Sequence, residues 1–184
     1  MAHHYGAPCH FVRARHDSGP RRAKSIRLVV IHSAESTSAA GVASFFAGSA
    51  QASTQLAVDD HECYRMLPDL VIPWGAPGAN SDGLHVEICG FAKWDAAQWR
   101  GHEPMLRRAA WKVAKWCWLY DIPPRWLTDR QLANGTSRGL TQHRQVSKVF
   151  KRSDHTDPGP NFPDELFIDW VVEYFAEIPS ARAR

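Results

Sequence analysis

The chain has 184 residues, of which 44% are hydrophobic and 22% are charged, and these values are ordinary for a globular protein. The length suits one domain with its own core, and no apolar run reaches the roughly 18 residues that a membrane-spanning helix needs. The formal net charge of +3 is typical of a mildly basic soluble domain, so we expect neither a nucleic-acid partner nor membrane insertion.

The N-terminal segment MAHHYGAPCHFVRARHDSG lacks the apolar stretch of a secretory signal peptide. The four Cys residues are far apart and form no CxxC pair, so we expect no disulfide framework. Cys89 and Cys117 lie in apolar runs and are predicted to be buried thiols. This cysteine usage is consistent with synthesis in a reducing cytosol.

The first predicted elements are a strand and a helix. Residues 26–32 (IRLVVIH) form the β-branched run that is typical of a buried central strand. A helix of small residues is expected next, with Ser36 or Ser38 as its N-cap and an end near Gly48.

A hairpin and a further strand are predicted after this helix. The stretches TQLAVD and ECYRML indicate two strands joined by a tight turn at residues 59–61. A loop rich in Pro and Gly follows, and residues 84–89 then alternate as a strand does. One face of this strand carries Leu84, Val86 and Ile88, and the other carries His85, Glu87 and Cys89.

The second half of the chain is predicted to be mainly helical. The longest helix begins at Pro104 and stops before Pro123, a shorter one is capped by Thr128, and a closing helix spans residues 162–178. The basic residues of the longest helix are predicted to form a solvated face: Arg108, Lys112 and Lys115.

Alternating strands and helices together with a hairpin predict an α/β fold. We expect a central mixed β-sheet of about five or six strands with helices on both faces. Residues 1–25 are expected to form an N-terminal extension packed on the domain, residues 26–178 the catalytic domain, and residues 179–184 a tail or linker.

Three distant side chains are candidate ligands of one metal ion. His32 ends the first strand, His143 follows the apolar stretch RGLT, and Asp157 precedes a Pro-Gly-Pro turn. A catalytic zinc site needs three protein ligands held on stiff elements. Each residue alone has an ordinary structural explanation, and spacing does not separate Asp157 from His155 as the third ligand.

Four stretches of the chain carry a family resemblance: LVVIHSAES, GLHVEICGF, LTQHRQVS and HTDPGPNFP, at residues 28–36, 83–91, 140–147 and 155–163. In this order and spacing the chain resembles the zinc-dependent N-acetylmuramoyl-L-alanine amidases. Phage endolysins, bacterial cell-wall recycling amidases and peptidoglycan recognition proteins share this type of domain. The resemblance runs from about residue 26 to residue 175, and the last stretch is most similar to actinobacteriophage endolysins.

The resemblance implies roles for five residues. His32, His143 and Asp157 match the ligands of a Zn²⁺ cofactor, and Glu87 matches the family's acid/base glutamate. Without the family, an exposed strand Glu is the first interpretation of Glu87. His155 stands where several relatives carry a Lys that stabilises the oxyanion, and the charge of an imidazole depends on pH near neutrality.

Two positions depart from the family pattern. Gly75 stands where many relatives carry the His of a WHAG loop, and Gln55 stands where many carry a His in the first hairpin strand. We therefore expect a differently shaped substrate groove. Gln55, Trp74 and Asn80 are candidate substrate contacts, although a packed loop Trp and a turn Asn are equally ordinary interpretations.

The implied activity is cleavage of the amide bond between N-acetylmuramic acid and L-alanine in peptidoglycan. We expect a monomeric phage endolysin that accumulates in the host bacterial cytoplasm and reaches the cell wall through a membrane pore. The alternatives are a non-catalytic peptidoglycan-binding module of the same fold and an unrelated domain with a structural zinc site. Structural zinc sites usually have four ligands rich in Cys, which argues against the last.

Overall fold

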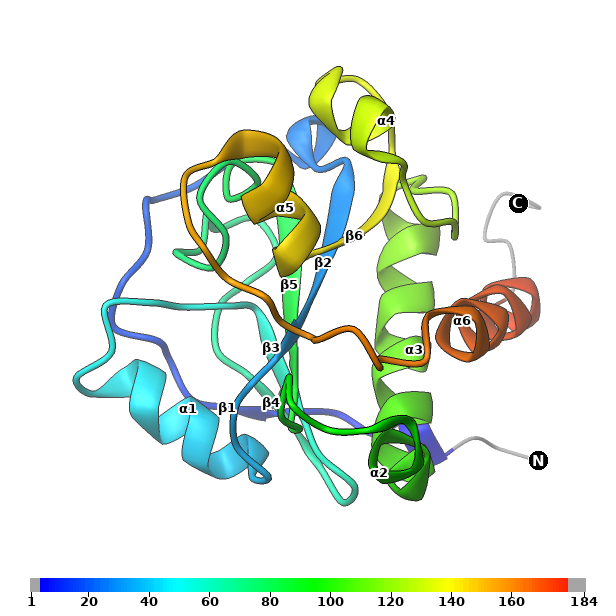
Figure 1. The fold of residues 1–184 in the computed structure, drawn as a ribbon. Coiled ribbons are helices and arrows are strands. Elements are labelled where there is room, and N and C mark those ends of the chain that lie inside the picture. The colour runs from blue at the N-terminus through cyan, green and yellow to red at the C-terminus, as the bar shows by residue number, and fades with distance from the viewer. Residues whose placement is uncertain (1–3, 179–184) are drawn as a thin grey trace, which may run out of the picture.

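The computed structural model describes residues 4–178, which form a six-stranded sheet with helices beside it (Figure 1). The strands are β1 (His10–Phe11), β2 (Leu28–Ser33), β3 (Leu56–Val58), β4 (Cys63–Arg65), β5 (Gly83–Ile88) and β6 (Gly139–Gln142). The predicted α/β class and mixed sheet are confirmed. The predicted tail at residues 179–184 lies outside the described residues.

The helices include two short 3-10 turns near the N-terminus. They are η1 (His4–Gly6), η2 (Ala23–Ser25), α1 (Ala39–Ala47), α2 (Ala96–Gly101), α3 (Glu103–Leu119), α4 (Asp129–Ala133), α5 (His143–Phe150) and α6 (Asp164–Glu177). None of these helices is both long and apolar enough to cross a lipid bilayer. Strand β1 and helices α2 and α5 were not predicted, because each is short or begins directly at another element.

The strand order of the sheet is β1-β4-β3-β5-β2-β6. Strand β2 runs parallel to both β5 and β6, and β3 pairs antiparallel with β4 as the predicted hairpin. Because β2, β5 and β6 are parallel, their carboxyl ends meet at one edge of the sheet. Ligands of parallel sheets usually bind at that edge.

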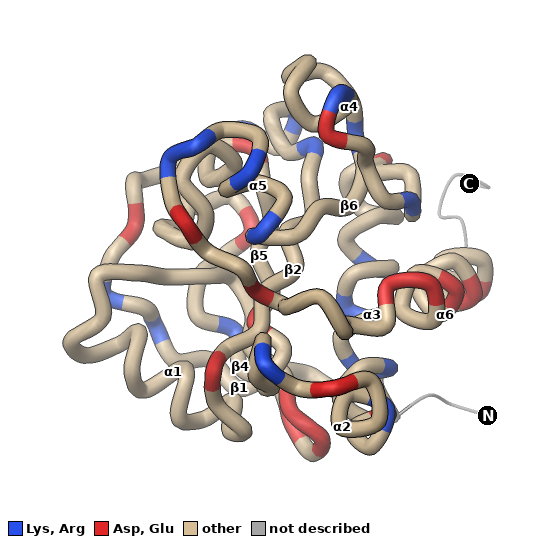
Figure 2. Tube along the Cα trace, viewed as in Figure 1, with Lys and Arg blue, Asp and Glu red and all other residues tan. Residues whose placement is uncertain are grey.

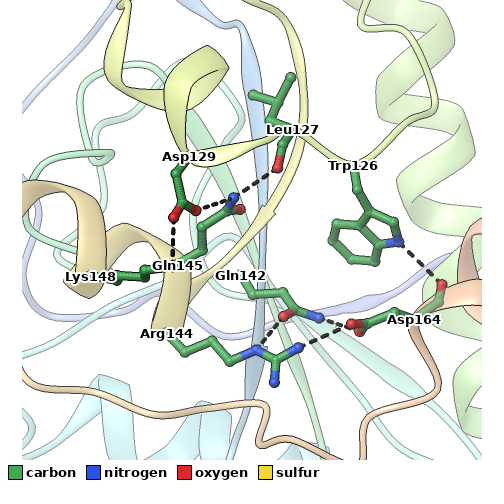
Figure 3. A pocket seen from close by; sticks show the side chains of 8 residues that line it. All are labelled: Trp126, Leu127, Asp129, Gln142, Arg144, Gln145, Lys148 and Asp164. Atoms are coloured by element: carbon green, nitrogen blue, oxygen red, sulfur yellow. Dashed lines mark hydrogen bonds and ion pairs between the residues drawn. The ribbon is translucent and has the colours of Figure 1, made fainter.

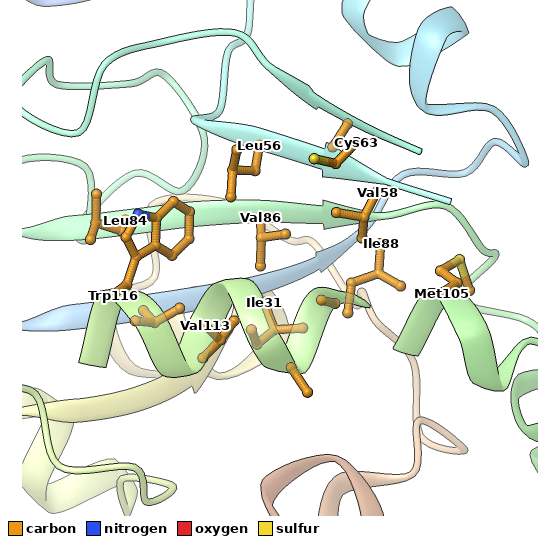
Figure 4. Close-up of a cluster of buried hydrophobic side chains, with 14 of the residues drawn as sticks. Ile31, Leu56, Val58, Cys63, Leu84, Val86, Ile88, Met105, Val113 and Trp116 are labelled. Atoms are coloured by element: carbon orange, nitrogen blue, oxygen red, sulfur yellow. The ribbon is translucent and has the colours of Figure 1, made fainter. Parts of the chain in front are cut away.

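The two faces of β2 are buried in different cores. Val29 and Ile31 belong to the large core that includes Val113 of α3, and Figure 4 shows Ile31 and Val113 among its side chains. Val30 belongs to a smaller core with Val146 of α5. In Figure 1, α3 and α6 lie on one side of the sheet and α1 and α5 on the other. Alternation therefore directs the face that carries Val30 toward α5.

Helix caps lie where the sequence predicts them. The Oγ atom of Ser38 accepts a hydrogen bond from the backbone N–H of Gly41, and α1 ends at Gly48. Thr128 and Gln131 form a capping box at the start of α4. A hydroxyl at the N-cap satisfies a backbone donor that otherwise has no partner in the helix.

Charged residues are distributed unevenly over the fold (Figure 2). Asp164 and Glu165 occupy the first turn of α6, where acidic side chains stabilise the helix dipole. Around the end of α5 the charges are basic, with Lys148, Lys151 and Arg152 all exposed. Although the net charge of the chain is small, Lys148, Lys151 and Arg152 thus form a basic patch beside α5.

The predicted solvated basic face of α3 is wrong for two of its three residues. Arg108 and Lys112 are buried, and only Lys115 is exposed. Arg108 donates hydrogen bonds to the carbonyls of Asp59 and His61 in the hairpin turn, and Lys112 donates to the carbonyl of Ala7. The N-terminal segment and the hairpin cover this side of α3, and their carbonyls need donors.

The structure corrects the expectation about disulfides. Cys9 and Cys63 form a disulfide with a Cα–Cα distance of 4.8 Å, because β1 pairs with β4 and brings the two residues together. Their separation of 54 residues gave no local signal of this contact. The expectation that no disulfide forms is therefore wrong, and this bond is of the kind that persists in an oxidising environment. Cys89 and Cys117 are buried free thiols, as predicted.

We expect the Cys9→Ser/Cys63→Ser double variant to lower the free energy of unfolding by about 2–4 kcal/mol, because the bond restricts the unfolded chain. Urea titration under oxidising conditions measures this difference. A reductant should lower the urea midpoint of the parent and leave that of the double variant unchanged. Equal midpoints for parent and variant would show that the bond adds no stability.

Candidate metal centre

Three buried side chains converge beside the sheet: His32, His143 and Asp157, with one possible ligand atom from each within 4.8 Å of the others. The Nδ1 atom of His32 lies 3.2 Å from Oδ2 of Asp157. The Nδ1 atom of His143 lies 3.1 Å from Oδ1 of the same carboxylate. The carboxylate thus stands between the two imidazole rings.

The parallel strands explain why these residues meet. His32 lies near the carboxyl end of β2, and His143 is the first residue of α5, directly after β6. Glu87 of β5 is paired with His32 in the sheet register. The chain then returns from α5 to the same edge, where the carbonyl of Asp157 accepts a hydrogen bond from the backbone N–H of Arg144 at 2.8 Å.

A polar network that includes the two residues flanking His143 supports the junction between β6 and α5 (Figure 3). Gln142 and Arg144, which flank His143, both donate to the carboxylate of Asp164. Arg144 also donates to the side-chain oxygen of Gln142 at 2.6 Å. These side chains line a pocket of about 470 Å³, but they pair with one another. We therefore assign them the task of holding the backbone around His143.

The loop that carries Asp157 depends on a glycine. Gly159 has a φ of +93°, which side chains rarely adopt, and a Cβ atom there would overlap the carbonyl oxygen of Ala92. The backbone N–H of Ala92 donates to the carboxylate of Glu35 at 2.7 Å. The loop at Gly159 is thus packed tightly against a segment that is itself held in place.

We expect Gly159→Ala to destabilise the protein by about 1–3 kcal/mol, the usual range for a strained backbone residue. Its affinity for zinc should also fall, because the clash displaces the loop that carries Asp157. Thermal unfolding and chelator competition measure the two effects. Gly101→Ala is the matched control, because a Cβ atom at Gly101 meets nothing within 4 Å. Parent-like zinc affinity in Gly159→Ala would contradict the role given to the loop.

The three converging residues line a pocket of about 710 Å³ together with Glu87 and His155. Its apolar wall includes Phe45 of α1, which is 58% exposed, and Trp74, which is 37% exposed. The pocket therefore joins a charged floor to an open aromatic wall. Such a combination is typical of a site that binds an organic ligand.

Glu87 is 7% exposed, so the interpretation as an exposed strand residue is wrong. Alternation places Glu87 on the pocket face of β5, and helices and loops cover that face. Burial raises the pKa of the Glu87 carboxyl to about 7, His32 opposes this shift, and the carboxylates of Asp157 and Glu35 add to it. A carboxyl group with such a pKa can accept and return a proton at neutral pH.

The pocket shifts the pKa values of the two imidazole rings in opposite directions. Burial lowers the pKa of His143 to about 4. Burial also lowers the pKa of His32, but the carboxylates of Glu87 and Asp157 outweigh it, so that the pKa is raised. Burial acts to raise the pKa of Asp157, but the neighbouring His143 and His32 rings hold it well below its usual range. A metal cation would satisfy the same carboxylates.

The chemistry of the donor set fits zinc. Two imidazole nitrogens and one carboxylate oxygen are ligands that Zn²⁺ takes in catalytic sites with three protein ligands. Oδ2 of Asp157 faces Nδ1 of His32 at 3.2 Å but makes no well-formed hydrogen bond, and Nε2 of His143 is buried without one. Buried polar atoms normally have partners, so these two atoms suggest a group that the protein is built to hold.

Comparison with known proteins identifies the family. The model of the N-acetylmuramoyl-L-alanine amidase family matches residues 22–160, which is most of the chain. The chain belongs to this amidase family. No curated protein sequence matches it significantly. The match spans the segments that carry His32, Glu87, His143 and Asp157.

Solved structures share the amidase fold at low sequence identity. The Staphylococcus aureus hydrolase AmiA in complex with its ligand is 17% identical, with a TM-score of 0.70 over 93% of this chain and 85% of its own. An AmpD derivative is 16% identical, with a TM-score of 0.61 over 90% and 95%. The amidase LysCS from Clostridium intestinale is 13% identical, with a TM-score of 0.52 over 87% and 92%.

The amidase structure brings His155 and Trp74 to the pocket. His155 is exposed, its ring stacks on that of His143 with centroids 4.0 Å apart, and its Nδ1 lies 3.2 Å from Oδ1 of Asp157. Trp74 stacks on His16 and donates through Nε1 to Ser18. Both side chains are open to a ligand, although their roles stay predictions.

Gln55 and Asn80, the other predicted substrate contacts, do not line this pocket. Gln55 is 0% exposed, and its side chain donates to the carbonyl of Val71 and accepts from the N–H of His85. The side-chain oxygen of Asn80 accepts from two backbone N–H groups of its own loop. The buried Gln55 amide and the Asn80 side-chain oxygen therefore satisfy backbone groups of the protein itself.

Three residues near the centre were absent from the predicted site: His85, Glu35 and Phe45. The strand alternation had already placed His85 on the face of Glu87. Glu35, two residues after β2, has a positive φ of 49°, and no local pattern signals this. Phe45 lies among small residues of α1, and only its exposure in the pocket indicates a contact role.

Proposed function

We propose that the protein is a zinc-dependent peptidoglycan hydrolase that cleaves the amide bond between N-acetylmuramic acid and the L-alanine of the stem peptide. The observation that carries this proposal is the buried group of His32, His143 and Asp157 with Glu87 in the same pocket. The match to the N-acetylmuramoyl-L-alanine amidase family supports the bond that is cut.

His32, His143 and Asp157 would hold the zinc ion. Zinc, when bound, supplies Lewis acidity that polarises the scissile carbonyl and lowers the pKa of water. The chain itself positions the ion by two rings and one carboxylate from elements that are packed on both sides. Its aromatic wall at Phe45 and Trp74 gives apolar surface on which a sugar ring or peptide can lie.

Glu87 is the proposed proton carrier. It accepts a proton from the water whose oxygen forms the new bond to the lactyl carbonyl carbon. It then delivers that proton to the L-alanine nitrogen as the C–N bond breaks. His155 is the proposed donor to the carbonyl oxygen while negative charge develops on it, because its ring is exposed at the pocket beside Asp157.

We also propose that the protein serves as a phage endolysin. Structural neighbours include proteins described as endolysins, among them LysCS and a mutant endolysin from Bacillus subtilis. The proposed place of storage is the host cytoplasm, followed by passage through a membrane pore. The disulfide between Cys9 and Cys63 would then form outside the reducing compartment. Cells that express the protein should lyse only after their inner membrane is permeabilised.

Mass spectrometry of digested, purified peptidoglycan tests the activity. We expect free stem peptides that begin with L-alanine and intact glycan strands that carry lactyl carboxylates. Glycan fragments or peptides cut at an internal bond would assign a different hydrolase activity. Peptidoglycan that is bound by the zinc-loaded protein but left uncut would favour the non-catalytic recognition module.

A further inference from the structure

A third imidazole extends the metal centre into the protein. His85 of β5 is 0% exposed, and its Nδ1 lies 3.0 Å from Nε2 of His32. The ring centroids of His32 and His85 are 5.2 Å apart, and those of His32 and His143 are 4.7 Å apart. The ring of His32 therefore has a neighbour at each of its nitrogens: Asp157 at Nδ1 and His85 at Nε2.

This contact determines where the protons lie. If Nδ1 of His32 faces the ion, its Nε2 must carry the ring proton and needs an acceptor. Only a neutral His85 with a free Nδ1 lone pair can accept it. The Nε2–H of His85 then points to the carbonyl of Ala79, 3.4 Å away.

The surroundings of His85 leave room for this ring and no more. A Cβ atom at Gly75 would lie 2.5 Å from Nδ1 of His85, and one at Gly83 would lie 2.8 Å from its Nε2. The backbone N–H of His85 donates to the side-chain oxygen of Gln55 at 2.8 Å. Glycine at positions 75 and 83 therefore leaves space for the His85 ring. Gln55 holds the backbone of β5 at His85.

We propose that His85 is the positioning residue of the metal centre, which fixes the tautomer and the ring orientation of His32. The proposal rests on the zinc site of the proposed function, but it concerns metal binding and not the bond that is cleaved. Partners of this kind orient a ligand His before the metal arrives, and their loss typically weakens metal affinity about 10- to 100-fold.

Two variants of His85 distinguish the effect of its hydrogen-bond acceptor from the effect of the space that its ring fills. His85→Leu fills similar space without an acceptor, whereas His85→Asn keeps an oxygen close to the position of Nδ1. We expect His85→Leu to bind zinc about 10- to 100-fold more weakly in chelator competition. His85→Asn should bind zinc nearly as tightly as the parent, because its side-chain oxygen can accept the same proton. The absorption spectrum of the cobalt-substituted protein should change in His85→Leu and be restored in His85→Asn.

The zinc-binding results for the His85 variants can be distinguished from a failure of the proposed amidase activity. Parent-like zinc affinity in a folded His85→Leu would overturn the assignment, and so would equal losses in the two variants. A parent that binds zinc with these differences but leaves peptidoglycan uncut would refute the amidase proposal alone. If His85→Leu does not fold, nitrogen-15 NMR of the zinc-loaded parent decides. A proton on Nδ1 of His85 would overturn the proposal, and a proton on its Nε2 supports it.

Discussion

Glu87→Gln is expected to lower turnover of purified peptidoglycan by about 100- to 10,000-fold, the usual contribution of general acid–base catalysis. Gln keeps the size of the side chain but cannot carry the proton from water to the departing nitrogen. Bound zinc should be unchanged, because Glu87 is not among the three converging ligand residues. The measurement is the rate of stem-peptide release together with the zinc content of the purified variant.

The thermal stability of Glu87→Gln distinguishes a loss of catalysis from misfolding of the variant. Burial of the ionised Glu87 carboxylate is unfavourable, so Glu87→Gln should unfold at the same temperature as the parent or above it. Glu173→Gln is the matched control, because Glu173 is exposed on α6. Parent-like turnover in Glu87→Gln would remove this residue from the mechanism.

Asp157→Ala is expected to remove zinc and activity together. Its carboxylate lies between His32 and His143, and without it two ring nitrogens remain. Activity should fall by more than about 100-fold, because loss of a ligand exceeds loss of a ligand's hydrogen-bond partner. Zinc content and peptide release are measured on the same preparation.

Added metal gives a second measurement for Asp157. Zinc at about 100 times its dissociation constant stabilises the folded parent by about 2.7 kcal/mol, and thermal unfolding should show this shift. Asp157→Ala should show no such shift, whereas Asp154→Ala should behave as the parent, because Asp154 is exposed in the same loop. A full complement of zinc in Asp157→Ala would disprove the ligand assignment.

Local sequence patterns predicted most of the secondary structure. The strand of β2, the cap at Ser38, the hairpin and the cap at Thr128 depend on neighbouring residues, so their patterns are visible in the sequence. The alternation in β5 also placed Glu87 and His85 on one face. It did not show that this face is buried, because burial depends on segments far along the chain.

The amino-acid sequence by itself determined the fold class and the family motifs. It also gave His32, His143 and Asp157 as candidate ligands of one metal ion. Only the tertiary structure decided that these three side chains meet, that His85 stands behind His32, and that Cys9 pairs with Cys63. The physical reason is the parallel order of β6, β2 and β5, and of β1 beside β4. Strand order depends on packing between distant segments, and no short stretch of the sequence records it.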